Sequence, residues 1–254
     1  MFKVINDLRD GLINIELKIN ALLDARPLNE SPHPDQWFGN ITYSQHGEDL
    51  LIKSIFSRLK ISTPKYVDVG AHHPFNISNT ALLYKTGSTG INIEANPNLF
   101  YEFQKQRPND INLNIGVSDV RSKLNFYMID EFSGRNSFDL ESVERFCKQN
   151  PSFKIRDIKE IDLFSLNEII DKYSNGISPD FLSIDVEGFD EKIIKNFDFL
   201  KYRPKVICIE TVDAKGVDKK ELKNYIKQMN FQLVCNMGGN SIFIDNEHAH
   251  YILE

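Results

Sequence analysis

The sequence predicts an α/β protein built on a mostly parallel sheet with helices on both faces. Apolar, β-rich runs such as 66–69 and 204–210 alternate with segments of helical periodicity over most of the 254 residues. This alternation is typical of a parallel sheet that is covered on both sides. Two further apolar runs flank Asn-Met-Gly-Gly-Asn at 236–240, which is a hairpin signal. We therefore expect an antiparallel hairpin at the C-terminal end of the sheet.

The first half of the chain supplies alternating helices and strands. Helices are expected over 42–59, 78–85 and 96–106, and strands over 66–69, 90–94, 111–117 and 123–129. Thr42 or Ser44 is expected to cap the first helix, and Gly87 to stop the second. Asn96 and Pro97 begin the third, because proline is favoured in the first turn of a helix.

The second half continues the alternation after a less regular segment. Helices are expected over 139–149, 165–173, 189–196 and 219–229, and strands over 180–186, 204–210, 231–235 and 241–245. Ser165 and Glu168 have the spacing of a capping box. The charged segment 130–160 lies between two core strands, and long inserted loops are usually functional. We expect it to form an acceptor lid, with Arg135 and Asn136 gripping a polar or anionic acceptor; the alternative is a mobile surface loop.

Composition excludes several classes of function. The net charge is −6 and no basic cluster is present, so nucleic acid is not an expected partner. The three cysteines are far apart and form no C-x-x-C pair, which fits a reducing compartment and gives no zinc signature. No apolar run approaches 18 residues and the N-terminus has no signal-peptide core. We therefore expect no membrane span and a cytoplasmic location.

The turn after the 66–69 run is the first candidate binding element. Asp68 lies within the strand, Gly70 ends it, and Ser78 is placed to begin a helix. A dinucleotide-binding turn needs G-x-G-x-x-G, but His72 and Phe75 replace its second and third glycines. S-adenosylmethionine has no phosphate and needs one glycine and an acid for its ammonium group. The alternative is an ordinary buried strand that ends at a turn glycine.

Acidic residues lie in or at the end of several predicted strands. Asp68, Glu94, Asp185 and Glu210 lie in or at the end of predicted strands, and Asp119 follows the third. Parallel strands place their carboxyl ends at one edge of the sheet, where ligands bind. Glu94 is positioned for the ribose hydroxyls of an adenosine cofactor, Asp119 for the adenine amino group, and Asp185 for the reacting atom. Alternatively, each acid is only a helix cap or first-turn charge.

Several of these segments resemble one family in order and spacing. They are Tyr-Ser-Gln-His-Gly-Glu-Asp (43–49), Tyr-Val-Asp-Val-Gly-Ala-His (66–72), Ser-Asn-Thr (78–80), Asn-Ile-Glu-Ala-Asn-Pro (92–97), Gly-Val-Ser-Asp (116–119) and Ser-Ile-Asp-Val-Glu-Gly (183–188). Over about 43–245 the chain resembles the FkbM-type S-adenosylmethionine-dependent methyltransferases. Residues 1–40 lie outside the resemblance.

The resemblance implies a seven-stranded Rossmann-like methyltransferase fold and O-methylation, most often of sugars or sugar-bearing metabolites. It places Asp68 and Gly70 at the methionine part of the cofactor, Glu94 at the ribose, Asp119 at the adenine, and Gln45 and Asn79 near the amino-acid end. The single glycine followed by His72 and His73 is a departure from the family's glycine-rich loop. Either histidine is therefore also a candidate to face the methyl group.

Methyl transfer to a sugar hydroxyl needs a base or a metal, because the hydroxyl is a very weak acid. The candidate bases are Asp185, Glu187 and His72. Asp185 and Glu210 end neighbouring strands, where catechol O-methyltransferase-like enzymes place magnesium ligands, so Mg²⁺ or another divalent metal is a further expectation. An NAD-dependent Rossmann enzyme and a non-catalytic methyltransferase-fold scaffold are the alternative functions.

The N-terminal 40 residues are expected to form a separate helix and linker, followed by the methyltransferase domain over 41–254. Apolar residues recur alternately every four and three positions at Met1, Ile5, Leu8, Leu12, Ile15, Ile19 and Leu22. This heptad stripe needs a partner surface, because a single helix of this length is marginal in water. Three prolines in the linker at 26–40 favour a second copy of the chain over the chain's own sheet.

We therefore predict a homo-oligomer assembled through residues 1–25. Deleting residues 1–26 should lower the mass measured by sedimentation or light scattering, because the apolar stripe is lost. Binding of S-adenosylmethionine should persist in the truncated protein. An unchanged subunit number after truncation would show that this helix is not the assembly element.

Overall fold

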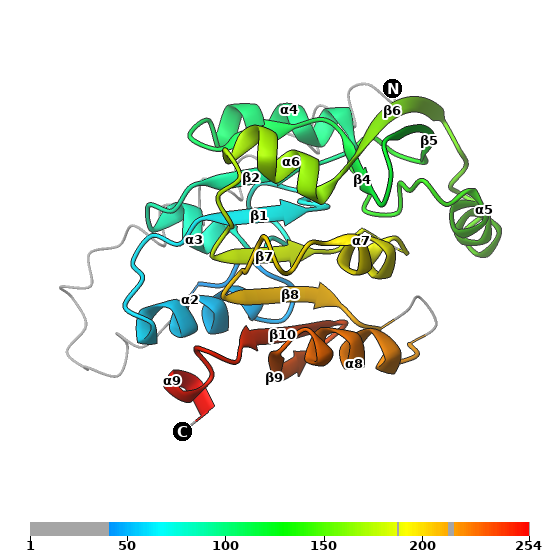
Figure 1. The fold of residues 1–254 in the computed structure, drawn as a ribbon. Helices are drawn as coiled ribbons and strands as arrows, with labels where there is room; N and C mark the ends of the chain where they lie inside the picture. The colour runs from blue at the N-terminus through cyan, green and yellow to red at the C-terminus, as the bar shows by residue number, and fades with distance from the viewer. Residues whose placement is uncertain (1–40, 187, 213–215, 254) are drawn as a thin grey trace, which may run out of the picture. The chain divides into compact units, whose positions relative to one another are not determined.

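A seven-stranded sheet forms the centre of the described chain. In the computed structural model, residues 41–186, 188–212 and 216–253 are described; the predicted N-terminal helix and linker, and Glu187, lie outside them. The strand order is β3-β2-β1-β7-β8-β10-β9, and the central strands lie side by side in Figure 1. The strands are β1 (Tyr66–Val69), β2 (Gly90–Ile93), β3 (Ile111–Leu113), β7 (Phe181–Ile184), β8 (Val206–Glu210), β9 (Phe231–Met237) and β10 (Asn240–Asp245).

Strands β3, β2, β1, β7 and β8 run parallel, and β10 pairs antiparallel with both β8 and β9. The predicted mostly parallel sheet and its C-terminal hairpin are therefore confirmed. The chain adds β2 and then β3 on one side of β1, whereas β7 and then β8 lie on the other side of it. The strand order therefore reverses between β1 and β7. Ligands of open α/β sheets bind beside such a reversal, at the carboxyl ends of the strands.

A second, three-stranded sheet has the order β4-β6-β5. Its strands are β4 (Gly116–Ser118), β5 (Ser122–Met128) and β6 (Asp157–Ser165). The single strand expected over 111–117 was wrong: β3 ends at Leu113, and β4 pairs with β6 in the smaller sheet. Strand β6 was not anticipated, although Ile161 and Leu163 alternate with acidic residues in the period of a half-buried strand.

Both faces of the large sheet are covered because its strands alternate their apolar side chains. Val67 and Val69 of β1 pack in one core with α6, α7 and α8, whereas Tyr66 packs in another core with α2 and α3. The helices are α2 (Glu48–Arg58), α3 (Ala81–Lys85), α4 (Pro97–Gln106), α5 (Leu140–Gln149), α6 (Leu166–Tyr173), α7 (Asp190–Asn196), α8 (Lys220–Gln228) and α9 (His250–Leu253). The capping box of Ser165 and Glu168 at α6 is present as expected.

Two helices begin later than the sequence indicated. Helix α2 starts at Glu48, not at Thr42, and α3 starts at Ala81, not at Ser78. Thr42 and Ser44 donate their hydroxyls to Asp49 at 2.6 Å and 2.8 Å. The side-chain bonds that were expected to cap a helix therefore hold the bend in front of α2, because hydroxyl groups compete with the helix for local hydrogen bonds.

A fully buried arginine follows α4 on the face covered by α2 and α3. Arg107 donates through Nε to Asp110 at 2.9 Å, through Nη2 to the Tyr66 hydroxyl at 2.6 Å, and through Nη1 to the Thr80 hydroxyl at 3.0 Å. The rings of Tyr66, Tyr84 and Phe103 surround its guanidinium at 5.0–5.4 Å. Removing one partner of such a pair costs about 3–5 kcal/mol, so this cluster ties β1, α3 and α4 together.

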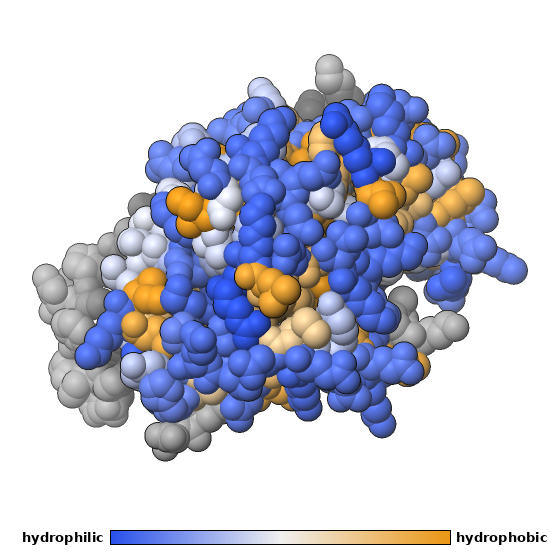
Figure 2. Space-filling view, viewed as in Figure 1, coloured by the Kyte–Doolittle hydropathy of each residue, from blue (hydrophilic) through white to orange (hydrophobic). Residues whose placement is uncertain are grey.

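The face of the molecule drawn in Figure 2 is mainly hydrophilic, and apolar residues show there in small separate groups. Among the residues that the structure describes, no helix combines the length and the apolar character needed to cross a membrane.

Candidate functional site

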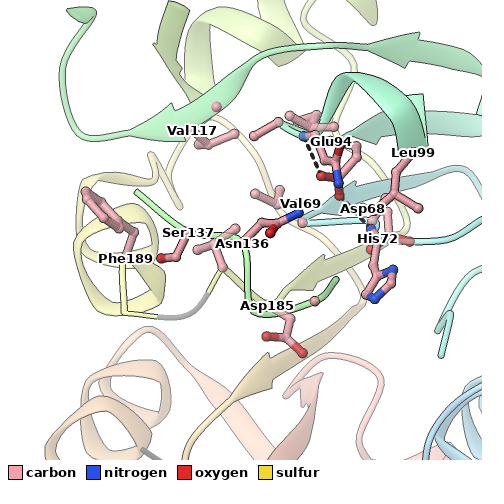
Figure 3. A pocket seen from close by; sticks show the side chains of 18 of the residues that line it. Asp68, Val69, His72, Glu94, Leu99, Val117, Asn136, Ser137, Asp185 and Phe189 are labelled. Atoms are coloured by element: carbon pink, nitrogen blue, oxygen red, sulfur yellow. Dashed lines mark hydrogen bonds between the residues drawn. The ribbon is translucent and has the colours of Figure 1, made fainter. Parts of the chain in front are cut away.

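A cavity of about 370 Å³ opens at the carboxyl ends of β1, β2 and β7 (Figure 3). The predicted site residues Gln45, Asp68, Gly70, His72, Asn79, Glu94 and Asp185 all line it. Residues from both sheets and from the segment 133–138 complete its wall. The structure therefore gathers in one cavity residues that are far apart in the sequence.

Asp119 and Glu210 are not among the described residues that line this cavity. Asp119 is exposed just after β4, which belongs to the smaller sheet. Glu210 ends β8 and is partly buried. The role predicted for Asp119 at the adenine amino group stays a prediction, and that for Glu210 is considered with its neighbours below.

Glu94 follows β2 and is almost fully buried at the cavity wall. Its Oε2 accepts a hydrogen bond from the His72 backbone N–H at 2.8 Å, and its Oε1 accepts one from the Asn96 backbone N–H at 2.7 Å. Burial raises the pKa of Glu94 to about 7, although these two hydrogen bonds oppose the rise. The carboxylate is thus held in one orientation by the loops that follow β1 and β2.

Asp68 and Gly70 lie where β1 meets β7. Burial raises the pKa of Asp68, against the opposing effects of a 2.6 Å hydrogen bond from the Thr80 hydroxyl and the charge of Arg107. Gly70 has φ of +77°, and a Cβ on it would collide with the backbone oxygen of Asp185. The glycine is therefore required for the close approach of β1 and β7, in addition to its conformation.

Asn79 and Gln45 enter the cavity from two connecting segments. The Asn79 amide donates to the Ser183 hydroxyl at 3.3 Å and to the Cys208 sulfur at 3.7 Å, which fixes it over β7 and β8. Gln45 lies in the bend before α2, and this segment is joined to the turn after β1 by the 2.9 Å bond from Ser78 N–H to the Tyr43 carbonyl.

Two buried acids hold the segment that carries Gln45. Asp49 accepts from the Tyr43 backbone N–H at 2.7 Å as well as from the hydroxyls of Thr42 and Ser44. Glu48 accepts from the His46 backbone N–H at 2.8 Å and from Asn240 at 3.1 Å. Burial raises the pKa of Glu48, but its hydrogen bonds together bring it below the usual value.

The segment 133–138 forms one wall of the cavity. Asn136 is buried and shapes it: its Oδ1 accepts from the Ile129 N–H at 2.9 Å, and its Nδ2 donates to the Asp130 carbonyl at 2.8 Å. Asn136 is thus engaged with its own loop, while Arg135 is exposed beside it and its guanidinium lies 5.9 Å from the Phe146 ring of α5. The expected lid region therefore contributes side chains to the cavity.

His72 has φ of +53° and lines the cavity against Gly134. A Cβ on Gly134 would lie 3.0 Å from the His72 Nε2, so the glycine makes room for the imidazole. The His72 Nδ1 is buried and has no hydrogen-bond partner among the described residues. Burial and, secondarily, the neighbouring His73 lower the pKa of His72, so its imidazole is neutral at neutral pH.

Asp185 is exposed at the end of β7 and shares a cluster of acids. One carboxylate oxygen from each of Asp185, Asp190 and Glu210 lies within 4.8 Å of the others. The Lys219 ammonium is 3.0 Å from Glu210 and 3.5 Å from Asp190. Burial lowers the pKa of Lys219, but these carboxylates outweigh it and keep the lysine charged.

Apolar residues that the sequence analysis did not single out make a large part of the wall. They are Val117, Phe126, Phe138 and Phe189, together with Ala95 and Leu99 beside Glu94. Phe138 packs against Phe126 at 4.9 Å and against Phe189 at 6.3 Å between ring centroids. The position of Phe189, directly after the Asp-Val-Glu-Gly turn, was the one local signal for this group. These side chains provide an apolar surface against which a planar ring can pack.

Comparison with known proteins identifies one family. The family described as "Methyltransferase FkbM domain" matches residues 68–233. No curated protein matches the chain significantly. Among solved structures, the chain is similar to a TehB-like SAM-dependent methyltransferase from Corynebacterium glutamicum, at 12% identity over 93% of this chain and 99% of that one, with a TM-score of 0.43.

A second solved structure is an O-methyltransferase from Bacillus cereus in complex with SAH, at 13% identity over 90% of this chain and 86% of that one, with a TM-score of 0.37. At these identities and scores, the likenesses add nothing to the match of the family itself. The match covers more than half of the 254 residues and contains the loops after β1, β2, β4 and β7. The chain belongs to the FkbM methyltransferase family.

Proposed function

We propose that the protein transfers the methyl group of S-adenosylmethionine to a hydroxyl of a sugar, nucleotide sugar or glycan-type acceptor. The observation that supports this most is the meeting of Asp68, Glu94 and Asp185 in one cavity at the carboxyl ends of adjacent strands. Three acids around one cavity repel one another and favour a ligand with positive charge and hydroxyl groups. S-adenosylmethionine carries an ammonium, a sulfonium and two ribose hydroxyls.

In this proposal each acid has one role toward the cofactor or the acceptor. Glu94 accepts from the ribose hydroxyls, and Asp68 attracts the ammonium group, with Gln45 and Asn79 nearby. The apolar group at Ala95 and Val117 provides a surface for the adenine ring. This arrangement leaves the methyl group near the end of β7, where Asp185 lines the cavity.

Methyl transfer is an in-line displacement at the methyl carbon. The acceptor oxygen forms a bond to that carbon, the carbon–sulfur bond breaks, and sulfur keeps the electron pair as a neutral thioether. The acceptor proton passes to a base, for which we propose Asp185, because its carboxylate is exposed and lines the cavity. His72 is the second candidate, and Glu187 stays a predicted participant outside the described residues.

Asp185 and Glu210 are the predicted metal ligands, and the structure places one carboxylate oxygen of each within 4.8 Å of one from Asp190. Lys219 already places a positive charge against two of them. A metal bound by all three would lie against this ammonium, which is unfavourable unless the lysine moves. The proposed mechanism therefore has no step through a metal, and activity should be insensitive to EDTA.

The first prediction concerns Glu94 and pH. Ribose hydroxyls donate to the ionised carboxylate, whose pKa is about 7 because it is buried. Below that pH the acid must lose its proton before the cofactor binds, so affinity should fall about tenfold per pH unit. Titration calorimetry with S-adenosylmethionine between pH 6 and 8 should show this fall in the wild-type protein.

Glu94→Gln is the matched control for this measurement. It should bind more weakly by about 1–3 kcal/mol at pH 8 and lose the pH dependence between pH 6 and 7. A titration curve that is the same for both proteins would remove Glu94 from the cofactor site.

A second prediction tests the base. Asp185→Asn should reduce the turnover number by about 10²–10⁴, because the amide takes up no proton, and should keep cofactor affinity within a few-fold. Glu191→Gln, an equivalent change in the Lys195 ion pair of α7, should leave turnover unchanged. Full activity of Asp185→Asn would transfer the role to His72 or Glu187.

The third prediction tests the acceptor class. Incubation with radiolabelled S-adenosylmethionine and a panel of nucleotide sugars and cell-surface glycans should label an anionic, hydroxyl-bearing acceptor, with and without EDTA. Arg135→Ala should raise the Michaelis constant for that acceptor about tenfold or more and leave the cofactor dissociation constant unchanged. Arg145→Ala on the exposed side of α5 should change neither. Labelling of none of these compounds would refute the proposed acceptor class.

A further inference from the structure

A chain of hydrogen bonds connects the buried Arg107 to the cavity through one hydroxyl. The Arg107 Nη1 donates to the Thr80 Oγ1 at 3.0 Å, and the Thr80 Oγ1 donates to the Asp68 Oδ2 at 2.6 Å. Thr80 and Arg107 are fully buried, and Asp68 is 3% exposed. Water therefore has little access to this chain, and its members depend on one another for hydrogen bonds.

The direction of the Thr80 proton follows from its neighbours. Arginine has only donor groups, so the Thr80 oxygen must accept from Arg107. The hydroxyl proton is then left for the carboxylate of Asp68, which at 2.6 Å has the length of a charge-assisted hydrogen bond. Thr80 is the N-cap residue of α3, but its side chain makes no capping hydrogen bond to the backbone of the helix. Its hydroxyl is therefore not used for the capping bond that an N-cap threonine usually makes.

Arg107 is itself held so that it cannot turn away. Its Nε is bonded to Asp110 and its Nη2 to the Tyr66 hydroxyl, and the Tyr66 hydroxyl donates in turn to Asp110. Asp110 also accepts from the Gly90 N–H at 2.8 Å and from Asn92 at 2.9 Å. The guanidinium thus presents its remaining edge to Thr80 in a fixed position.

We propose that Thr80 and Arg107 are positioning residues that hold the Asp68 carboxylate, ionised and correctly oriented, for the ammonium group of S-adenosylmethionine. The inference rests on the proposed function, because it assigns the cofactor's ammonium to Asp68. The ionisable groups that interact with Asp68 are Arg107 and Asp110 behind it, Glu94 just after the adjacent strand β2, and Cys208 on β8. Arg107 is the one cation in this group.

The charges around Asp68 explain why the hydrogen bonds that run from Arg107 through Thr80 to Asp68, here called the relay, are needed. Burial raises the pKa of Asp68, and Asp110 raises it further, while the Thr80 hydrogen bond, the Arg107 charge and a hydrogen bond with Ser183 lower it, in decreasing order. Removing the hydroxyl would leave burial less opposed, so Asp68 would take up a proton at higher pH. A neutral Asp68 would lose most of its attraction for the ammonium and none of its packing.

The test compares two ligands with and without the amino-acid part that carries the ammonium group. S-adenosylmethionine has this part, whereas 5′-methylthioadenosine keeps the adenosine and the methylated sulfur, lacks the amino-acid part, and has an uncharged thioether in place of the sulfonium. Thr80→Val removes the hydroxyl at constant shape, Thr80→Ser keeps it, and Thr86→Val makes the same change at an exposed position at the opposite end of α3. Dissociation constants are measured by calorimetry from pH 6 to 8.5.

Thr80→Val should bind S-adenosylmethionine at pH 7 roughly tenfold more weakly than the wild type and 5′-methylthioadenosine within about twofold of it. Its loss of S-adenosylmethionine affinity at low pH should begin at a higher pH than in the wild type. Thr80→Ser should restore wild-type binding to within about threefold, and Thr86→Val should match the wild type. In an Asp68→Asn background, Thr80→Val should add no further selective loss.

Unchanged binding of S-adenosylmethionine by Thr80→Val, or an equal loss of both ligands with an unshifted pH profile, would overturn the relay while leaving the proposed function intact. Failure of the wild-type protein to bind S-adenosylmethionine would overturn the proposed function and this inference together. If Thr80→Val does not fold, Thr80→Cys, whose thiol is a weak donor, carries the same expectations.

Discussion

The buried charge of Arg107 is the constraint on which the rest of the site depends. A guanidinium in the interior is tolerated only when its donors are satisfied and its charge is compensated. Asp110, Tyr66 and Thr80 provide this, and they come from three different parts of the chain. The turn after β1 cannot change position without disturbing that cluster, so the loop that meets the ligand is supported from behind.

The same principle applies at the other acids of the cavity. Glu94 is held by backbone N–H groups of the loops after β1 and β2, and Asp49 by the segment that carries Gln45. Each buried carboxylate is thus used to fix a loop whose neighbours line the cavity. Hydrogen bonds to buried carboxylates orient a site well, because charged hydrogen bonds away from water are stronger and more directional than those at the surface.

The wall contributed by the smaller sheet has a different character. Phe126, Phe138 and Phe189 form a connected group of rings, and Arg135 lies exposed in the loop beside them. The acids lie in or after strands of the large sheet, whereas Phe126 and Phe138 come from β5 of the smaller sheet and the loop that follows it, and Phe189 at the start of α7 packs against Phe138. In the proposed function the large sheet binds the polar groups of the cofactor. The inserted segment 130–160, with Arg135 and α5, selects the acceptor.

Much of the fold was predictable because it depends on local patterns. The β1 and β7 runs, the capping box at α6 and the C-terminal hairpin each follow from a few consecutive residues, and all four are present. Strand β6 was missed because charged residues obscure its short alternation. The start of α2 was misplaced because Thr42 and Ser44 found a tertiary partner in Asp49 in place of a helix end.

Most strands and helices, the acids at the strand ends and the family motifs could be predicted from the sequence, since these are properties of short segments; β6 and the division of β3 from β4 could not. Which of the acids meet depends on the tertiary structure. Asp68, Glu94 and Asp185 share a cavity because β2, β1 and β7 are neighbours in one sheet, whereas Asp119 is exposed because β4 pairs with β6 in another. Pairing between distant strands is set by packing over the whole domain, and no local spacing encodes it.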